Sequence, residues 1–206
     1  MRIVVDMEHE WAELENRSGL ARNFIRESHR HLPMLRLYLP FTDKRGAVVR
    51  WTHYVPVDEL PASLDWFEAA DRIARDRPGV RGLDSCTGQL DENTAAALRD
   101  AIGNVALECL RWVGYAEVPR SNSVTRVFGE DYFGANLDPE DVSASQRVPE
   151  FAWNSDGRLA WGGRLYPDSL IIAAEVPIFR QLRNDPRLDT ASVIPHRDIL
   201  PPSSGD

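Results

Sequence analysis

The segment "MLRLYLPF", residues 34–41, alternates leucine with other residues along its first half. Its leucines fall on one side of an extended chain, with Arg36 and Tyr38 on the other side, because successive side chains of a strand point to opposite faces. After the turn residues "TDKRG", the segment 47–55 alternates again and places three side chains on one side: Val49, Trp51 and His53. The two segments predict a β-hairpin.

A second hairpin is predicted in "FAWNSDGRLAWGG", residues 151–163. Its turn residues "NSDGR" separate one aromatic strand from another, and we expect Trp153 and Trp161 on the same face. Such a pair is typical of cross-strand packing, although it is also compatible with the wall of a ligand site. The segment 169–177 is mainly apolar, and this pattern is compatible with either a buried strand or a buried helix. A short helix is predicted after Pro177.

Three helical regions are predicted from apolar spacing. The first covers 8–31 and is divided near Gly19, the second covers 60–75, and the third covers 92–113 with Asp91 as its N-cap. The third has a stripe at i, i+4, i+7, i+11 and i+14 that predicts one buried face: Leu98, Ile102, Val105, Cys109 and Trp112.

These elements predict an α+β fold with an antiparallel or mixed sheet built from two hairpins and packed by about three main helices. At 206 residues, the length fits one globular domain over 1–200, followed by a flexible tail at 201–206. The two cysteines lack the CxxC spacing of a zinc or redox site, and we expect both to be free thiols.

Composition excludes several classes of protein. Hydrophobic residues at 43% and charged residues at 27% are ordinary for a globular chain, so global disorder is not expected. The net charge of −8 argues against binding to a nucleic-acid backbone. There is no apolar run near the roughly 18–20 residues that span a bilayer and no basic-then-apolar leader, so we expect a cytoplasmic protein without a membrane partner.

The N-terminal stretch "RIVVDMEHEW" has two readings. A strand that ends in D-x-E resembles the first motif of the DEDD-type 3′–5′ exonucleases, and this resemblance implies divalent metal ions held by Asp6 and Glu8 in a phosphodiester hydrolase. The same residues also fit a helix start, with Asp6 as N-cap and acids in the first turn. We favour the helix start, which requires no metal or other cofactor.

The segment 128–146 carries acids but no base, and is read as a loop. Asp138 before Pro139 predicts a helix cap, whereas the other acids and two aromatic residues predict a docking surface: Glu130, Asp131, Tyr132, Phe133, Glu140 and Asp141. Because no GxSxG, phosphate-binding loop or Rossmann fingerprint occurs, we expect a non-catalytic binding protein. It would be an acidic partner, or an immunity-like neutraliser, of a protein with a basic surface; the alternative is the metal-dependent hydrolase.

Overall fold

The computed structural model describes residues 3–6, 19–56, 60–77, 79–80, 82–116 and 123–203. Its large sheet has nine strands, in the spatial order β1 (Ile3–Asp6), β7 (Ser123–Val127), β8 (Glu130–Leu137), β6 (Leu107–Trp112), β9 (Phe151–Trp153), β10 (Leu159–Gly162), β11 (Ser169–Ala174), β2 (Met34–Tyr38) and β12 (Asp189–Val193). Neighbouring strands are antiparallel except β1 and β7, which are parallel, so the sheet is mixed. The predicted α+β class is confirmed.

The two faces of the large sheet have separate cores. Helices α3 (Glu92–Ile102) and α4 (Val176–Asn184) pack on one face, in a cluster with the strand residues Leu35 and Leu37. The short 3-10 helices η1 (Ala21–Phe24) and η2 (Glu27–His29) lie against the other face, where η1 supplies Phe24 to the second core. The face of each strand residue therefore decides which core it joins.

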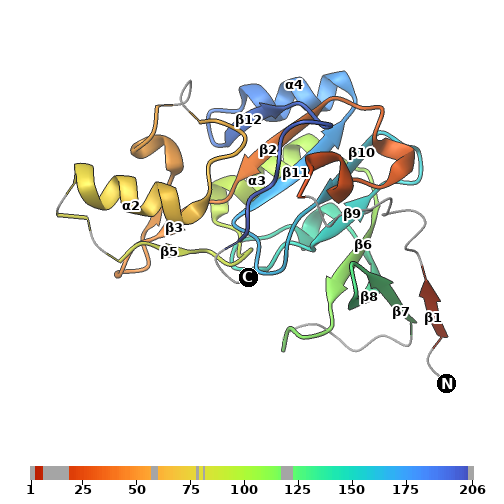
Figure 1. Cartoon of the computed structure of the whole chain (residues 1–206). Coiled ribbons are helices and arrows are strands. Elements are labelled where there is room, and N and C mark those ends of the chain that lie inside the picture. The colour runs from red at the N-terminus through yellow and green to blue at the C-terminus, as the bar shows by residue number, and fades with distance from the viewer. Residues whose placement is uncertain are drawn as a thin grey trace.

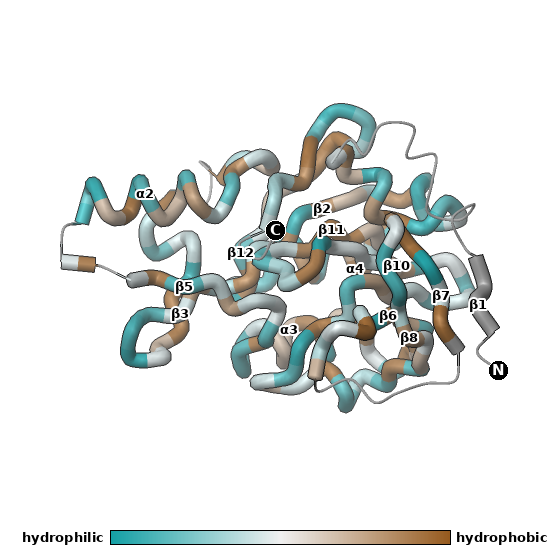
Figure 2. The backbone as a smooth tube through the Cα atoms, turned by 60° about the horizontal axis from the view of Figure 1, so that its bottom comes forward, coloured by the Kyte–Doolittle hydropathy of each residue, from teal (hydrophilic) through white to brown (hydrophobic). Residues whose placement is uncertain are grey.

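A smaller unit extends from one end of the large sheet (Figure 1; Figure 2). It contains helix α2 (Trp66–Asp76) and a three-stranded sheet of β4 (Val48–Val49), β3 (Phe41–Thr42) and β5 (Asp84–Ser85). Its apolar centre also includes Tyr38 from β2 and Ala191 from β12. The small unit and the large sheet thus share a continuous apolar contact.

The alternation of "MLRLYLPF" is confirmed, but the predicted hairpin is confined to two residue pairs next to its turn, Phe41 with Val49 and Thr42 with Val48. Strand β2 pairs with β11 and β12, whereas the hairpin near residue 45 joins only β3 to β4. The segment Trp51–His53 is a 3-10 helix, η3, because burial of one indole decides its local structure. The Trp51 Nε1 donates to the carbonyl of Leu39 at 2.7 Å, and the ring stacks on Phe41 with 4.6 Å between centroids.

The second hairpin, β9 to β10, is confirmed, but its tryptophans do not share a face. Trp153 lies opposite Ala160 and Trp161 lies opposite Ala152, so the two indoles enter the two different cores. The register is fixed by Asn154, whose Oδ1 accepts the backbone N–H groups of residues 158 and 159 at 2.8 and 2.9 Å. The continuous apolar segment that follows is strand β11, with the predicted short helix, α4, directly after it.

Helix α3 confirms the predicted N-cap but ends earlier than predicted. Asp91 accepts the N–H groups of residues 93 and 94, and the helix stops at Gly103, which has φ of +62°. A left-handed φ is favourable only for glycine, so the chain turns there and continues as β6. Cys109 is buried as expected, but on a strand, because pairing with β8 and β9 overrides the helical spacing.

Other predicted segments need correction. Within the predicted helix 8–31, residues 7–18 lie outside the described residues, and 21–24 and 27–29 form 3-10 turns. Helix α2 lies within the predicted range 60–75 for most of its length, but buries Ala69 and Ile73 while Phe67 is exposed. In the predicted tail, Ser203 is buried and donates to the carbonyl of residue 165 at 2.6 Å, and residues 204–206 lie outside the described residues. No helix of the described residues is long and apolar enough to cross a bilayer.

Arg36 is fully buried between the large sheet and the segment that leads into α2. Its Nε donates to the hydroxyl of Ser169 at 2.9 Å, and its Nη1 donates to the carbonyls of Ala62 and Leu64 at 2.9 and 2.6 Å. Its Nη2 lies 3.8 Å from the Asp168 carboxylate. One guanidinium thus joins strands β2 and β11 to the small unit.

We predict that Arg36→Met lowers the free energy of unfolding by about 3–5 kcal/mol, because it leaves carbonyls and a carboxylate buried without their cation. Urea unfolding measures this difference. Arg75→Met, on the exposed side of α2, is the control and should change stability by less than about 0.5 kcal/mol. Equal effects of the two substitutions would contradict the assigned role of Arg36.

Candidate functional site

Strand β8 separates the acidic residues that were predicted to form one docking surface. Glu130 and Asp131 begin the strand, whereas Glu140 and Asp141 lie in the 3-10 helix η5 (Pro139–Asp141) beyond its end. An eight-residue strand places its ends about 24 Å apart at the usual rise per residue. The two pairs of acids therefore belong to different parts of the surface.

The expectation of a loop at 128–146 is wrong for its first half. Tyr132 and Phe133 are only 3% and 5% exposed, because β8 is paired on both sides, with β6 and β7. The Tyr132 ring lies 5.6 Å from that of Phe151 in the core. The aromatic part of the predicted docking surface is therefore not exposed.

The acids at the first end of β8 have local partners. Glu130 accepts the indole N–H of Trp112 at 3.0 Å, and Asp131 is paired with Arg126 at 3.1 Å. At the second end, the backbone N–H of Asp138 donates to the carboxylate of Asp141 at 2.9 Å, which confirms the predicted cap.

The residues of the predicted metal site are only partly described. Asp6 ends β1, opposite Arg126 of β7, and Glu8 lies outside the described residues. In the described ranges, there is no group of three or more histidine, cysteine, aspartate or glutamate side chains that could hold a metal ion.

A cavity of about 400 Å³ lies between the small sheet, the N-terminus of α3 and residues 144–145. Its charged lining residues are Asp91 and Glu92, and among the described residues no lysine, arginine or histidine lines it. The rest of the wall comes from three segments: 40–48, 85–90 and 144–145. Because Asp91 and Glu92 directly follow the second of these segments, the cavity is an acidic site assembled from three separate parts of the chain.

The two acids of the cavity are positioned by the start of α3. One oxygen of Asp91, Oδ1, accepts the N–H groups of Asn93 and Thr94 at 3.0 and 3.3 Å, while Oδ2 is buried and accepts no hydrogen bond from the described residues. Glu92 is exposed and lies 3.5 Å from Arg99. Glu92 is therefore the carboxylate of this cavity that is open to solvent, whereas the second oxygen of Asp91 is buried.

The backbone around the cavity is strained. Among the described non-glycine residues, four have a clearly positive φ, and two of these, Thr87 at +48° and Ser145 at +65°, line the cavity. Residue 90 holds this region together, since its N–H donates to the carbonyl of residue 146 at 3.0 Å and its carbonyl accepts from the N–H of Ser145 at 2.7 Å. Such conformations cost on the order of 1–3 kcal/mol and are concentrated at functional sites.

A buried network supports the strained residue Thr87. Arg147 donates to the Thr87 carbonyl, and its guanidinium lies 4.3 Å from the centre of the Tyr115 ring. Tyr115 in turn donates its O–H to Glu150, which is fully buried and also accepts the backbone N–H of Trp112 at 3.0 Å. Burial raises the pKa of Glu150, and burial together with Glu150 raises the pKa of Tyr115.

Sequence reasoning identified Asp91 as a cap and Glu140 and Asp141 as surface acids, but not the cavity. Its walls come from segments that no spacing rule connects, and the positive φ of Thr87 and Ser145 has no signal in the residue types.

Comparison of the chain with protein-family models, with curated proteins and with solved structures found no match in any of the three.

We predict that a thiol reagent labels Cys86 before Cys109, and both much more slowly than a free thiol. Burial raises the pKa of Cys86 to about 12 and that of Cys109 to about 11, so little reactive thiolate exists at neutral pH. Cys86 lines the cavity, whereas Cys109 is reached only when the sheet opens, so access decides the order. The Cys86→Ala variant should lose the faster phase; fast labelling of Cys109 would contradict the described packing.

We also predict that Glu150 makes the protein less stable as pH rises. Because its pKa is raised in the folded state, folded Glu150 keeps its proton where unfolded Glu150, with a pKa of about 4.3, has lost it. The free energy of unfolding should therefore fall as pH rises from about 4.3 to the folded pKa, and Glu150→Gln should remove this part of the slope. Urea unfolding at several pH values tests this, and an identical slope in both proteins would contradict it.

Proposed function

We propose that this chain is a non-catalytic binding protein whose partner presents a basic surface, and that a lysine or arginine side chain of the partner enters the acidic cavity. An immunity-like role, in which the chain neutralises a basic protein, fits this chemistry. The proposal includes a cytoplasmic location.

One observation carries the proposal: the charged side chains that line the cavity, Asp91 and Glu92, are both acidic. The N-terminus of a helix carries about half a positive charge, which opposes a cation. Asp91 and Glu92 place two carboxylates against this partial charge, and Arg99, which lies 3.5 Å from Glu92, does not itself line the cavity. The net charge of −8 adds long-range attraction for a basic partner.

The metal-dependent phosphodiester hydrolase stays a prediction from the sequence alone. It rests on Asp6 and Glu8, of which only the backbone of Asp6 is described. No observation on the described residues favours it over the binding role.

The test uses a partner retrieved from the native host, purified, and measured by association kinetics at low and high salt. We predict that Glu92→Gln weakens binding about tenfold, because a charge-assisted hydrogen bond contributes about 1.5–3 kcal/mol. Glu68→Gln is the matched control, since Glu68 is an exposed acid in the first turn of α2 and does not line the cavity.

The separation along β8 provides a second control. Glu140→Gln with Asp141→Asn should lower the association rate at low salt, because exposed charges act mainly on encounter. Glu130→Gln with Asp131→Asn removes two charges about 24 Å away and should have a smaller effect. A partner without a basic surface, or a partner that binds the Glu92→Gln variant with unchanged kinetics, would overturn the proposal.

A further inference from the structure

Strand β12 lies at the end of the large sheet and pairs only with β2 among the described strands. In an antiparallel pair, alternate residues bond to the neighbour, and the others direct their N–H and C=O groups outward. No turn or loop bond of the described chain uses the backbone of residues 190–193. This edge can therefore accept a further strand.

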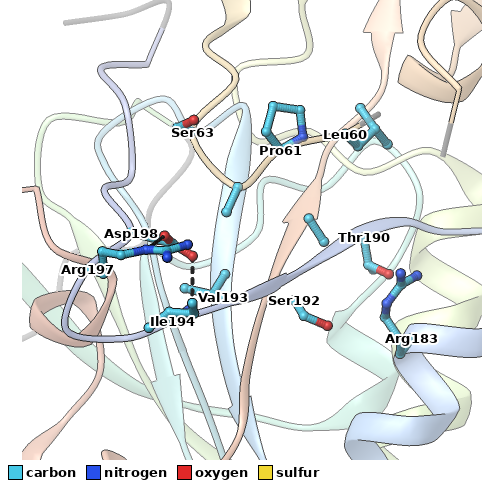
Figure 3. A pocket seen from close by; sticks show the side chains of 12 residues that line it. Leu60, Pro61, Ser63, Arg183, Thr190, Ser192, Val193, Ile194, Arg197 and Asp198 are labelled. Atoms are coloured by element: carbon cyan, nitrogen blue, oxygen red, sulfur yellow. Dashed lines mark hydrogen bonds and ion pairs between the residues drawn. The ribbon is translucent and has the colours of Figure 1, made fainter. Parts of the chain in front are cut away.

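A cavity of about 510 Å³ runs along this edge (Figure 3). Five consecutive residues of the chain line it, 190–194, and the segment 60–63 forms the opposite wall. A run of five extended residues covers about 13 Å, which is enough for a short extended peptide.

The opposite wall is held in place by β2. Tyr38 donates its hydroxyl to the carbonyl of Pro61, and Arg36 donates to the carbonyls of Ala62 and Leu64 at 2.9 and 2.6 Å. Because side chains of the sheet use these carbonyls, the wall is preorganised, and binding does not have to order it.

Strand β12 itself is fixed at both ends. At its start, Asp189 accepts the hydroxyl of Thr52 at 2.7 Å. Just beyond its end, the N–H of Ile194 donates to the carboxylate of Asp198 at 2.8 Å. The strand between these anchors is therefore held in place; its Ser192 is exposed, whereas Thr190, Ala191 and Val193 are buried.

Two guanidinium groups flank the cavity. Figure 3 shows Arg183 of α4 near Thr190 and Arg197 near Ile194, at the other end of the run. Arg183 has no ion pair or hydrogen bond with the described residues, whereas Arg197 lies 3.1 Å from Asp198. The site thus has a cation at each end and one carboxylate, which is already paired.

We propose that the open edge of β12 binds an extended acidic peptide segment of a partner protein by strand addition, with an acidic residue of the segment at Arg183 and a second at Arg197. The backbone of β12 supplies the hydrogen bonds, and the two arginines select for charge. This site is separate from the acidic cavity at α3 and does not depend on the function proposed for it.

A second copy of this chain fits the edge less well. If two β12 edges paired in antiparallel fashion, Arg183 of one copy would approach Arg197 of the other, and parallel pairing would bring the identical arginines together. Like charges across an interface are unfavourable, so the charge distribution favours an acidic segment over self-association.

The test measures amide NMR spectra of the full chain with three capped peptides. The acidic probe is Glu-Thr-Val-Thr-Glu, whose glutamates are about 13 Å apart when it is extended. The second peptide carries lysine in place of both glutamates, and the third is the acidic probe with N-methyl groups on alternate residues, which removes strand pairing. We expect the acidic probe to shift the amides of 190–194 and to slow their hydrogen exchange, and the other two peptides to have much weaker effects.

Arg183→Gln should weaken binding of the acidic probe about tenfold, whereas Arg180→Gln, an exposed residue of the same helix that does not line the cavity, should leave it unchanged. Equal binding of the N-methylated peptide would overturn strand addition and leave a simple anion site. Equal binding of the lysine peptide, no binding of the acidic probe, or a dimer in sedimentation with β12 protected without peptide would each overturn the proposal.

Discussion

The buried guanidinium of Arg36 is the interaction on which the arrangement of the two units depends. A charge without solvent is costly unless it is paired and hydrogen-bonded, and Arg36 satisfies this requirement only where Ser169, Asp168 and the segment 62–64 meet. The fork geometry of arginine bonds several acceptors at once, which a lysine does not match. Together with the shared apolar cluster around Tyr38 and Ala191, this contact holds α2 and the adjoining cavity wall against the large sheet.

Both candidate sites lie where the small unit meets the large sheet. The acidic cavity uses the small sheet, the start of α3 and the loop 144–145, and the edge cavity uses the segment 60–63 and β12. Such junctions are common places for ligand sites, because two rigid bodies with separate cores leave a gap that neither fills. Here both units are held together by buried polar groups, so the gaps have a fixed shape.

The two sites have opposite charge for a local reason. At the start of α3, acids are favoured as caps and by the helix dipole, which accounts for Asp91 and Glu92 without any partner. At the edge of β12, Arg183 lies near the C-terminus of α4, where a cation is favoured in the same way. The preferences of helix ends for charge therefore account for the opposite charge of the two cavities.

The sequence by itself determined the α+β class, the strand at 34–38, the hairpin at 151–162 and the cap at Asp91, because each depends on neighbours within a few residues. It predicted a helix where β6 lies and a loop where β8 begins, because these strands owe their state to partners distant in the chain. Only the tertiary structure decided that Tyr132 and Phe133 are buried, that the predicted acids are divided, and that Asp91 and Glu92 line a cavity. The spacing of apolar residues predicts which face of a helix or strand is buried. The position of a site depends instead on which helices and strands pack against one another in the tertiary structure.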